Sequence, residues 1–308
     1  MEKNNIEILK DYYKRVCAPL IFINEYILED CCRAKVYLYD FQKEEELNNF
    51  KKVFQEYIPF YVKNFDRISR YKLTESEEEI SKLLLSKAKH IKKTENILPD
   101  REIRMNGIYG EVYNDFYVRN ILQNERLITY LSRRSYERPN SENQGIDIVA
   151  CSIKDENIEV VFSEAKFVTD INSAGSKLKD DVQNHVSKDY INNFLQFVMQ
   201  KQGEVINERK IEINNKINEF NDLMEDEEIT FIEALNKMKF SVKFIFFAIF
   251  NNEIRETVIY ESKIKEIIKE FNSKIEETEI NDYSIEVVFV PTFNSSMNLK
   301  NKMEEWDE

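Results

Sequence analysis

A glutamate and a lysine interrupt an apolar stripe in the segment 158–167, which its β-branched and aromatic content predicts to be a strand. Side chains alternate between the two faces of a strand. One face of this segment therefore carries Ile158, Val160, Phe162, Glu164 and Lys166. Charged side chains in line with a core stripe conflict with local folding, and such conflicts are expected at functional sites. Glu164 and Lys166 are therefore candidate catalytic residues.

Another carboxylate, Asp147, lies in the preceding segment 145–153 (GIDIVACSI), which is also predicted to be a strand. A charged side chain in a strand this apolar is costly unless it is paired or bound to a metal ion. Residues 155–157 predict a turn, so the two segments form a hairpin. The hairpin places Asp147 and Glu164 on neighbouring strands.

Paired carboxylates with a nearby lysine suit the hydrolysis of a phosphodiester. The carboxylates of Asp147 and Glu164, with the backbone carbonyl of Ala165, offer the oxygen ligands that Mg²⁺ or Mn²⁺ prefers. A bound ion lowers the pKa of its water and neutralises the phosphate. Lys166 can position that water or stabilise the transition state.

The elements around these residues are predicted in the order α-β-β-β-α-β, with an extra α-β after it. The expected segments are 108–122, 127–134, 145–153, 158–167, a long helix through 178–198, 240–250, 262–271 and 283–291. Glu111 lies early in the first helix and is a third candidate ligand, and Gly110 before it would permit a close backbone approach. The order predicts an α/β fold, a mixed sheet flanked by helices.

Pattern changes divide the chain into residues 1–100 and 101–308. The first part is predicted to be an α/β accessory region, with a strand at 34–41 and helices at 44–57 and 75–91. In the second part, the highly charged residues 203–238 predict an inserted helical hairpin. A solvated strut is the usual structure of so charged a segment.

The composition bounds the class of protein. The chain has 308 residues, of which 42% are hydrophobic, so a sizeable core can form. The four cysteines include no CxxC pair and only two histidines accompany them, which disfavours a zinc site. Unpaired cysteines, no apolar leader and no membrane-length apolar run predict a cytoplasmic protein without membrane spans.

The segment Gly107–Lys188 contains IYGEVYNDFYVRNIL, QGIDIVA and VVFSEAKFVTDINSAGSKLKDDV. It resembles the core of HamA, the nuclease subunit family of the Hachiman anti-phage defence system, which is similar to PD-(D/E)xK nucleases. The resemblance implies a restriction-endonuclease-like core with an active-site set of Glu111, Asp147, Glu164 and Lys166. The proline of the superfamily name is absent, because Ile146 precedes the aspartate.

The resemblance also implies a partner. In that family the nuclease works with a large superfamily 2 helicase, HamB, which restrains it until aberrant or invading DNA is sensed. Residues 1–100 lack catalytic candidates and are the predicted partner-binding region. The net charge of −13 disfavours solitary DNA binding and fits a nuclease that its partner loads. Gln183 stands where related nucleases often contact their substrate.

Other readings stay open. The arginines near the first predicted strand could contact phosphates or be ordinary solvated residues. They are Arg119, Arg126, Arg133, Arg134 and Arg138. A stand-alone restriction-type endonuclease would need its own sequence-reading element, and none is evident. A catalytically silent, nucleic-acid-binding regulatory subunit is disfavoured by the intact Glu164 and Lys166.

Overall fold

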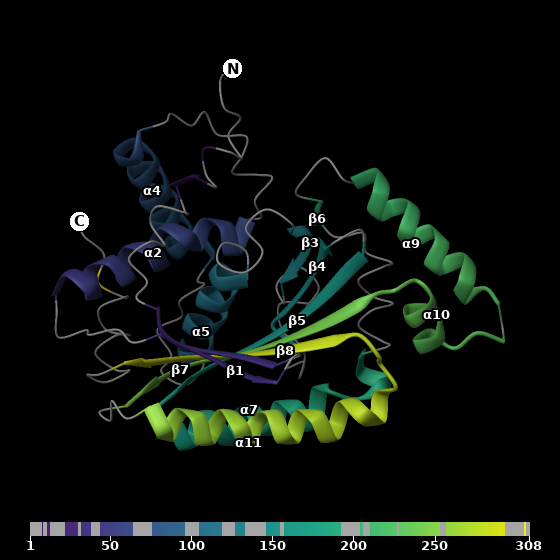
Figure 1. Ribbon diagram of the computed structural model, residues 1–308. Coiled ribbons are helices and arrows are strands. Elements are labelled where there is room, and N and C mark those ends of the chain that lie inside the picture. Colours follow the sequence, from purple (N-terminus) through teal and green to yellow (C-terminus); the bar gives the residue numbers. More distant parts are fainter. Residues whose placement is uncertain are drawn as a thin grey trace.

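An eight-stranded mixed β-sheet runs through the centre of the protein in the computed structural model (Figure 1). The structure describes residues 8, 11–12, 22–29, 32–37, 44–63, 76–95, 105–118, 127–132, 146–154, 157–191, 204–205, 210–226, 228–252, 257–292 and 305. The strands are β1 Phe22–Glu29, β2 Cys32–Tyr37, β3 Leu127–Ser132, β4 Ile148–Lys154, β5 Asn157–Val168, β6 Glu204–Val205, β7 Ser241–Asn251 and β8 Tyr283–Thr292. The helices are α2 Glu44–Lys63, α4 Glu77–Glu95, α5 Met105–Phe116, α7 Ile171–His185, α9 Lys210–Met224, α10 Phe231–Lys237, α11 Thr257–Ile275 and the 3₁₀ turn η2 Glu276–Thr278.

The middle of the sheet is parallel and its two ends are antiparallel. The strand order is β1-β2-β8-β7-β5-β4-β3-β6. Strands β5, β7, β8 and β2 run parallel to one another, while β4, β3 and β6 at one end and β1 at the other add antiparallel strands. Parallel strands are covered on both faces and therefore read as continuous apolar runs. The prediction of a central buried strand at 240–250 is confirmed by β7.

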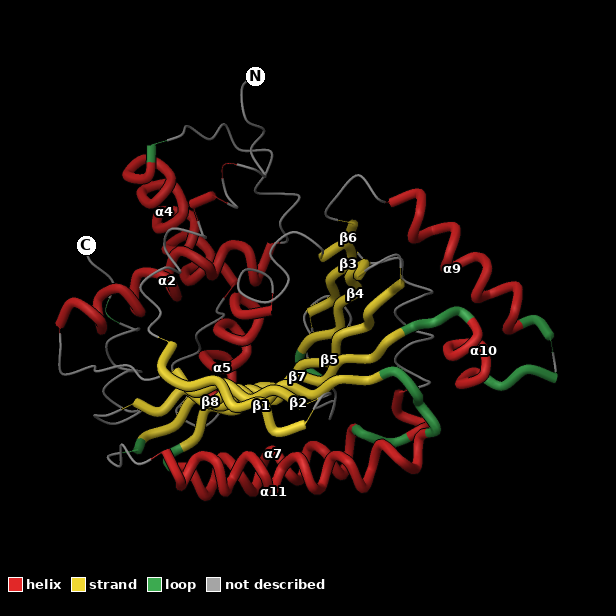
Figure 2. Tube along the Cα trace, in the orientation of Figure 1, coloured by secondary structure: helices red, strands yellow, loops and turns green. Residues whose placement is uncertain are grey.

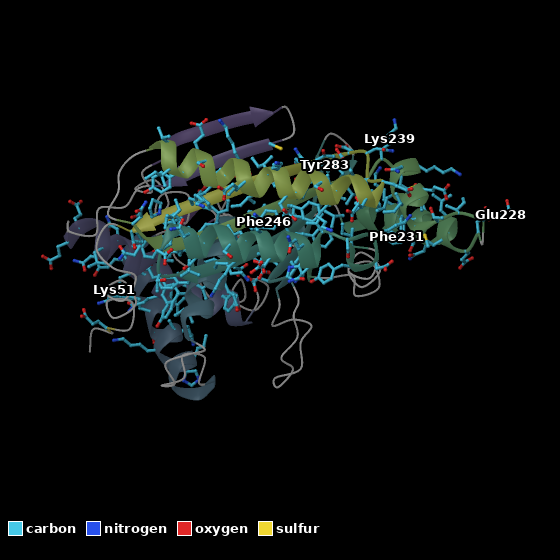
Figure 3. All side chains as sticks on the ribbon, turned by 90° about the horizontal axis from the view of Figure 1, so that it is seen from below. Lys51, Glu228, Phe231, Lys239, Phe246 and Tyr283 are labelled. Atoms are coloured by element: carbon cyan, nitrogen blue, oxygen red, sulfur yellow. The ribbon has the colours of Figure 1, made fainter. Side chains whose placement is uncertain are left out.

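Helices cover both faces of the sheet. Figure 1 and Figure 2 show α7 and α11 side by side beneath it and α5 with α2 above it. Neighbouring residues of β7 point into different layers: the ring centroid of Phe246 lies 6.3 Å from that of Phe271 on α11, and Phe247 lies 6.0 Å from Tyr113 on α5. In Figure 3 the labelled Phe246 and Tyr283 lie beside α11. The sheet therefore separates two apolar cores.

The predicted order of elements is confirmed. Helix α5, strands β3, β4 and β5, helix α7 and strand β7 follow one another, and α11 and β8 come after them. Strands β4 and β5 pair as a hairpin in which Lys154 opposes Asn157. A mixed α/β sheet flanked by helices is therefore the fold class, as the sequence predicted. None of the described helices is both long and apolar enough to cross a membrane.

The helix after β5 is shorter than predicted. The four-residue apolar spacing favours a helix through 178–198, but α7 ends at His185. Val186 leaves the helical conformation, with φ −93° and ψ 72°. Ser187 then caps a new turn, because its hydroxyl accepts a hydrogen bond from the Tyr190 N–H at 3.3 Å. The rest of the predicted helix, beyond 191, lies outside the described residues.

The N-terminal region shares its sheet and its core with the rest of the chain. The strand predicted at 34–41 is β2, shifted toward the N-terminus, and both predicted helices are present as α2 and α4. Strand β1 was not predicted. Strand β2 runs parallel to β8, and Phe50 of α2 stacks on Tyr113 of α5 with ring centroids 4.3 Å apart. The functional division near residue 100 stays a prediction.

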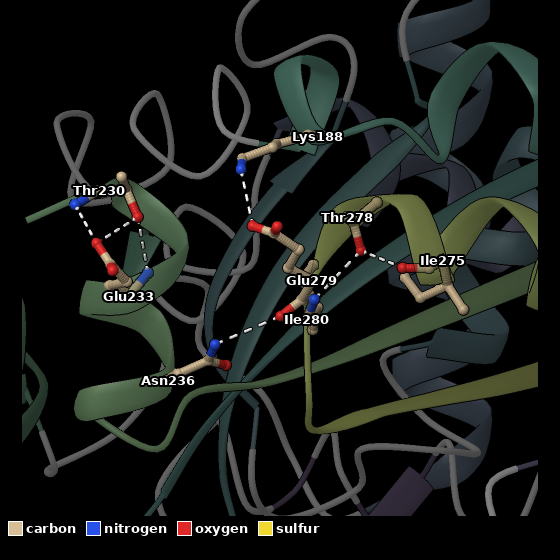
Figure 4. Close-up of polar contacts among 8 residues, drawn as sticks. All are labelled: Lys188, Thr230, Glu233, Asn236, Ile275, Thr278, Glu279 and Ile280. Carbon is tan, nitrogen blue, oxygen red and sulfur yellow. Dashed lines mark hydrogen bonds and ion pairs between the residues drawn. The ribbon is translucent and has the colours of Figure 1, made fainter.

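The insertion predicted at 203–238 contains the helices α9 and α10, and one apolar face of it packs on the core. Phe220 of α9 stacks on Phe240 at 5.6 Å and meets Phe231 of α10 edge-on at 5.1 Å, all three buried. Its short strand β6 also extends the sheet beside β3. Polar contacts hold α10 from outside: the Asn236 Nδ2 lies 3.4 Å from the carbonyl of Glu279, whose carboxylate pairs with the Lys188 Nζ at 2.9 Å (Figure 4).

Candidate active site

The Asp147 and Glu164 carboxylates each accept a hydrogen bond from a backbone N–H of the opposite chain segment. Ile148 opposes Ser163 in the β4–β5 ladder, so Asp147, directly before β4, stands opposite Glu164. The Asp147 N–H donates to Glu164 Oε2 at 3.1 Å, and the Ala165 N–H donates to Asp147 Oδ2 at 2.8 Å. Both residues are buried, because only 4% of the Asp147 surface and 6% of the Glu164 surface is exposed. The hairpin therefore places the two carboxylates together, as the sequence predicted.

The alternation of β5 brings Lys166 to the same place. Ile158, Val160 and Phe162 lie in the core on the α7 side, while Val161 and Phe167 lie in the other core. This confirms the predicted stripe that leads to Glu164 and Lys166. The Lys166 Nζ donates to Glu164 Oε1 at 2.7 Å.

Helix α7 supplies an acidic residue that the sequence reasoning missed. The Asp181 Oδ2 lies 2.9 Å from the Lys166 Nζ, and the Asp181 side chain is 11% exposed. The helix starts at the N-cap Asp170, whose carboxylate accepts from the Ser173 N–H at 2.9 Å. Its apolar face, with Leu178 and Val182, packs into the core and carries Asp181 with it. Lys166 therefore bridges carboxylates from a strand and a helix.

Helix α5 approaches the opposite face of β5 at the same level. A Cβ built on Gly110 would lie 3.3 Å from the backbone carbon of Lys166 and 3.3 Å from the Phe167 nitrogen, so glycine permits this contact, as predicted. Glu111 follows and accepts a hydrogen bond from the Tyr61 hydroxyl of α2 at 2.5 Å. The charge of Glu111 acts on Asp147, because it helps to raise the pKa of that carboxyl.

The cluster holds more negative charge than Lys166 balances. Burial, then the charges of Glu164 and Glu111, raise the pKa of Asp147 well above its usual value. Burial and Glu164 raise the pKa of Asp181 to about 7, against the opposing effect of Lys166. Burial alone would lower the pKa of Lys166, but Glu164 and Asp181 outweigh it and raise that pKa, which keeps the ammonium charged. Such a site favours a further cation.

Tyr190 and His185 are also part of this neighbourhood. The Ile146 N–H donates to the Tyr190 hydroxyl at 2.7 Å, and burial, together with the nearby carboxylates, raises the pKa of that phenol. The His185 ring lies against the Tyr190 ring with centroids 4.8 Å apart. His185 shares a face of α7 with Asp181, since the two are four residues apart. The four-residue spacing could have placed His185 and Asp181 together from the sequence. The end of α7 at His185, which directs Tyr190 toward Ile146, could not have been predicted from the sequence.

Several predicted contacts are not brought to the cluster. Gln183 is exposed, and its Nε2 donates to Glu270 of α11 at 2.9 Å. It lies on the opposite side of α7 from Asp181, so its role as a substrate contact stays a prediction that no contact here supports. The predicted DNA-binding arginines all lie outside the described residues. They are Arg119, Arg126, Arg133, Arg134 and Arg138.

The donor chemistry fits Mg²⁺ or Mn²⁺, because carboxylate and carbonyl oxygens are what these ions prefer. The charges of Glu164 and Glu111 help to raise the pKa of Asp147, and a bound cation would relieve that repulsion. In the part of the chain that the structure describes, however, no three acidic, histidine or cysteine side chains stand ready to hold a metal ion. Both Glu164 oxygens and one oxygen each of Asp147 and Glu111 accept hydrogen bonds from protein donors.

The fold and this cluster define an α/β protein with a buried carboxylate–lysine site at a strand hairpin. A model of the HamA family matches residues 20–306, nearly the whole chain, and the chain belongs to this family. The match includes most of the N-terminal region, beyond the segment in which the resemblance was first seen. HamA is a component of the Hachiman system, so the protein has a role in anti-phage defence. No curated protein matches the chain.

Proposed function

We propose that the protein is a metal-dependent DNA nuclease, the cytoplasmic effector of an anti-phage defence complex. The observation that carries this proposal is the reciprocal bonding of Asp147 and Glu164, with the Lys166 ammonium on the second carboxylate. The order α5-β3-β4-β5-α7-β7 supports a PD-(D/E)xK core around them. Membership of the HamA family supports the defence role.

The proposed roles follow from the contacts. Mg²⁺ or Mn²⁺ would be held by Asp147, Glu164, Glu111 and the backbone carbonyl of Ala165. When bound, the ion lowers the pKa of its water and neutralises the phosphate. Lys166 remains protonated beside two carboxylates, so its ammonium stabilises negative charge on the phosphate or orients the attacking water. Burial of the cluster strengthens each of these charge interactions.

The proposed partner is a superfamily 2 helicase of the HamB type, which restrains the nuclease and loads it onto DNA. The net charge of −13 supports this, because proteins that bind nucleic acid unaided usually present a basic face.

One observation favours a second candidate function, a catalytically silent subunit that regulates its partner. Among the described residues the carboxylates do not converge as metal ligands. A silent subunit would keep them as structural hydrogen-bond acceptors. The two functions differ in whether the cluster binds a divalent cation and whether its charges are needed for DNA cleavage.

The test is plasmid cleavage by the purified protein, with Mg²⁺ or with EDTA, and with or without the helicase partner. Glu164→Gln and Lys166→Met are compared with a matched pair outside the site, Glu261→Gln and Lys265→Met, which alter an exposed ion pair of 2.5 Å on α11. We expect cleavage that needs metal and falls by about 100-fold or more in the first two variants. The control variants should cleave as the unmodified protein does.

Dependence on the helicase would separate a complex-bound effector from a stand-alone endonuclease. The absence of cleavage under every condition, with the partner still bound, would make the silent regulatory subunit the better account. Loss of cleavage in all four variants would show a general loss of folding instead of a site, so a melting curve accompanies each variant.

A further inference from the structure

Asp181 holds the candidate catalytic lysine from a helix that carries none of the predicted ligands. The Lys166 Nζ lies 2.7 Å from Glu164 Oε1 and 2.9 Å from Asp181 Oδ2. The Glu164 side chain is 7% exposed and the Asp181 side chain 11% exposed, so little water competes for the ammonium. The ammonium donates a hydrogen bond to Glu164 Oε1 and forms an ion pair with Asp181, so it has a carboxylate on two sides.

The Lys166 ammonium and a divalent cation would compete for the Glu164 carboxylate. In this structure its Oε1 accepts from the Lys166 ammonium and its Oε2 accepts from the Asp147 N–H. A divalent cation that takes this carboxylate as a ligand repels the ammonium on the same group. Lys166 must then move away from Glu164 or weaken cation binding. An acceptor beyond Glu164 decides which of these happens.

We propose that Asp181 is a positioning residue that retains the Lys166 ammonium beside the site when a divalent cation takes over Glu164. This inference rests on the proposed function, because it needs a cation at Glu164. Asp181 acts through Lys166 and not on the cation itself. Without the Asp181 charge, the ion pair with Glu164 remains, and the ammonium competes with the cation for that carboxylate.

The experiment measures Mn²⁺ binding to the full chain, from the spectrum of free Mn²⁺ by electron paramagnetic resonance, without DNA. Asp181→Asn should weaken Mn²⁺ binding by about tenfold, the scale of a hydrogen bond to a charged group. The matched control is Asp180→Asn, which removes the same charge from the neighbouring, exposed position of α7. It should leave Mn²⁺ binding within about twofold, since an exposed charge is screened.

A double-mutant cycle separates action through the lysine from a direct effect of charge. In a Lys166→Met background, Asp181→Asn should lose its effect on Mn²⁺ binding. An equal weakening in that background would overturn the proposal, because Asp181 would then act on the cation directly. Lys166→Gln, which is neutral but can still donate hydrogen bonds, replaces Lys166→Met if that variant does not fold.

The outcomes also separate this inference from the proposed function. If the unmodified protein does not bind Mn²⁺, the metal-dependent nuclease and the positioning role of Asp181 both fail. If it binds Mn²⁺ and Asp181→Asn binds equally well, the positioning role alone fails. The expected result is weakened binding that depends on the presence of Lys166.

Discussion

Replacing Lys166 by methionine is expected to destabilise the metal-free protein by about 3 kcal/mol at about pH 8. Methionine keeps the length of the side chain and removes its charge. Removing one partner of a buried ion pair costs about 3–5 kcal/mol, because the other charge stays buried without compensation. The lower figure applies here, since the Lys166 side chain is 22% exposed and water relieves part of the loss.

The cost should depend on pH. Burial and Glu164 raise the pKa of Asp181 from its usual value of 3.8 to about 7, and Lys166 lowers it, so the removal of Lys166 raises that pKa further. An acid whose folded pKa lies above its unfolded value contributes stability below the unfolded pKa, and this is lost as pH rises through the folded pKa. The lost ion pair with Glu164 contributes to the cost of Lys166→Met at both pH values, and the Asp181 contribution adds to it above about pH 7, so the cost should be larger at pH ~8 than at pH ~5.

The assay is urea unfolding in EDTA, followed by circular dichroism at both pH values. The control is Lys265→Met, whose partner Glu261 is on the surface and whose own side chain is 59% exposed, so it should cost under about 0.5 kcal/mol. Adding Asp181→Asn to Lys166→Met should regain part of the lost stability. A cost at alkaline pH no larger than that of the control, or one that is equal at both pH values, would refute the reasoning.

Three smaller predictions concern the elements that build the site. Gly110→Val should lower the free energy of unfolding by about 1–3 kcal/mol, because a side chain there meets the backbone of Lys166, and Gly110→Ala should be milder; equal stability of the valine variant would count against a close helix–strand contact. Tyr190→Phe should cost about 1 kcal/mol and speed hydrogen exchange of the Ile146 amide, which loses its acceptor; unchanged exchange would contradict the bond. Thr230→Ala removes the capping box of α10 and should cost about 1 kcal/mol in urea unfolding, while Thr230→Ser should cost almost nothing; equal costs would show that the cap is not the cause.

The part of the site on the β4–β5 hairpin could be predicted from the sequence, because its signals are local. Side-chain alternation along β5 places Glu164 and Lys166 on the face of an apolar stripe. A short turn sets the pairing, and that pairing places Asp147 opposite Glu164. The close approach of α5 at Gly110 could also be predicted, since a glycine within a helix commonly marks a close backbone contact.

Other features depended on where elements end and which strands become neighbours. The recurrence of apolar residues favoured a long helix, but the break after His185 ended α7 and directed Tyr190 toward Ile146. The strands β1 and β2 joined the sheet beside β8, a pairing across most of the chain that no local pattern encodes. Such contacts are decided by which apolar faces remain to be covered once the core strands have paired.

The sequence by itself determined the apolar periods of the core elements, the carboxylates and lysine on the hairpin, and the short length of every apolar run. Only the tertiary structure decided that Asp181 meets Lys166 and that Gln183 turns away toward α11. The physical reason is that the rotation of a helix about its axis follows from the whole surface on which it packs. The packing of Leu178 and Val182 sets that rotation for α7, and the same rotation places Asp181 beside Lys166.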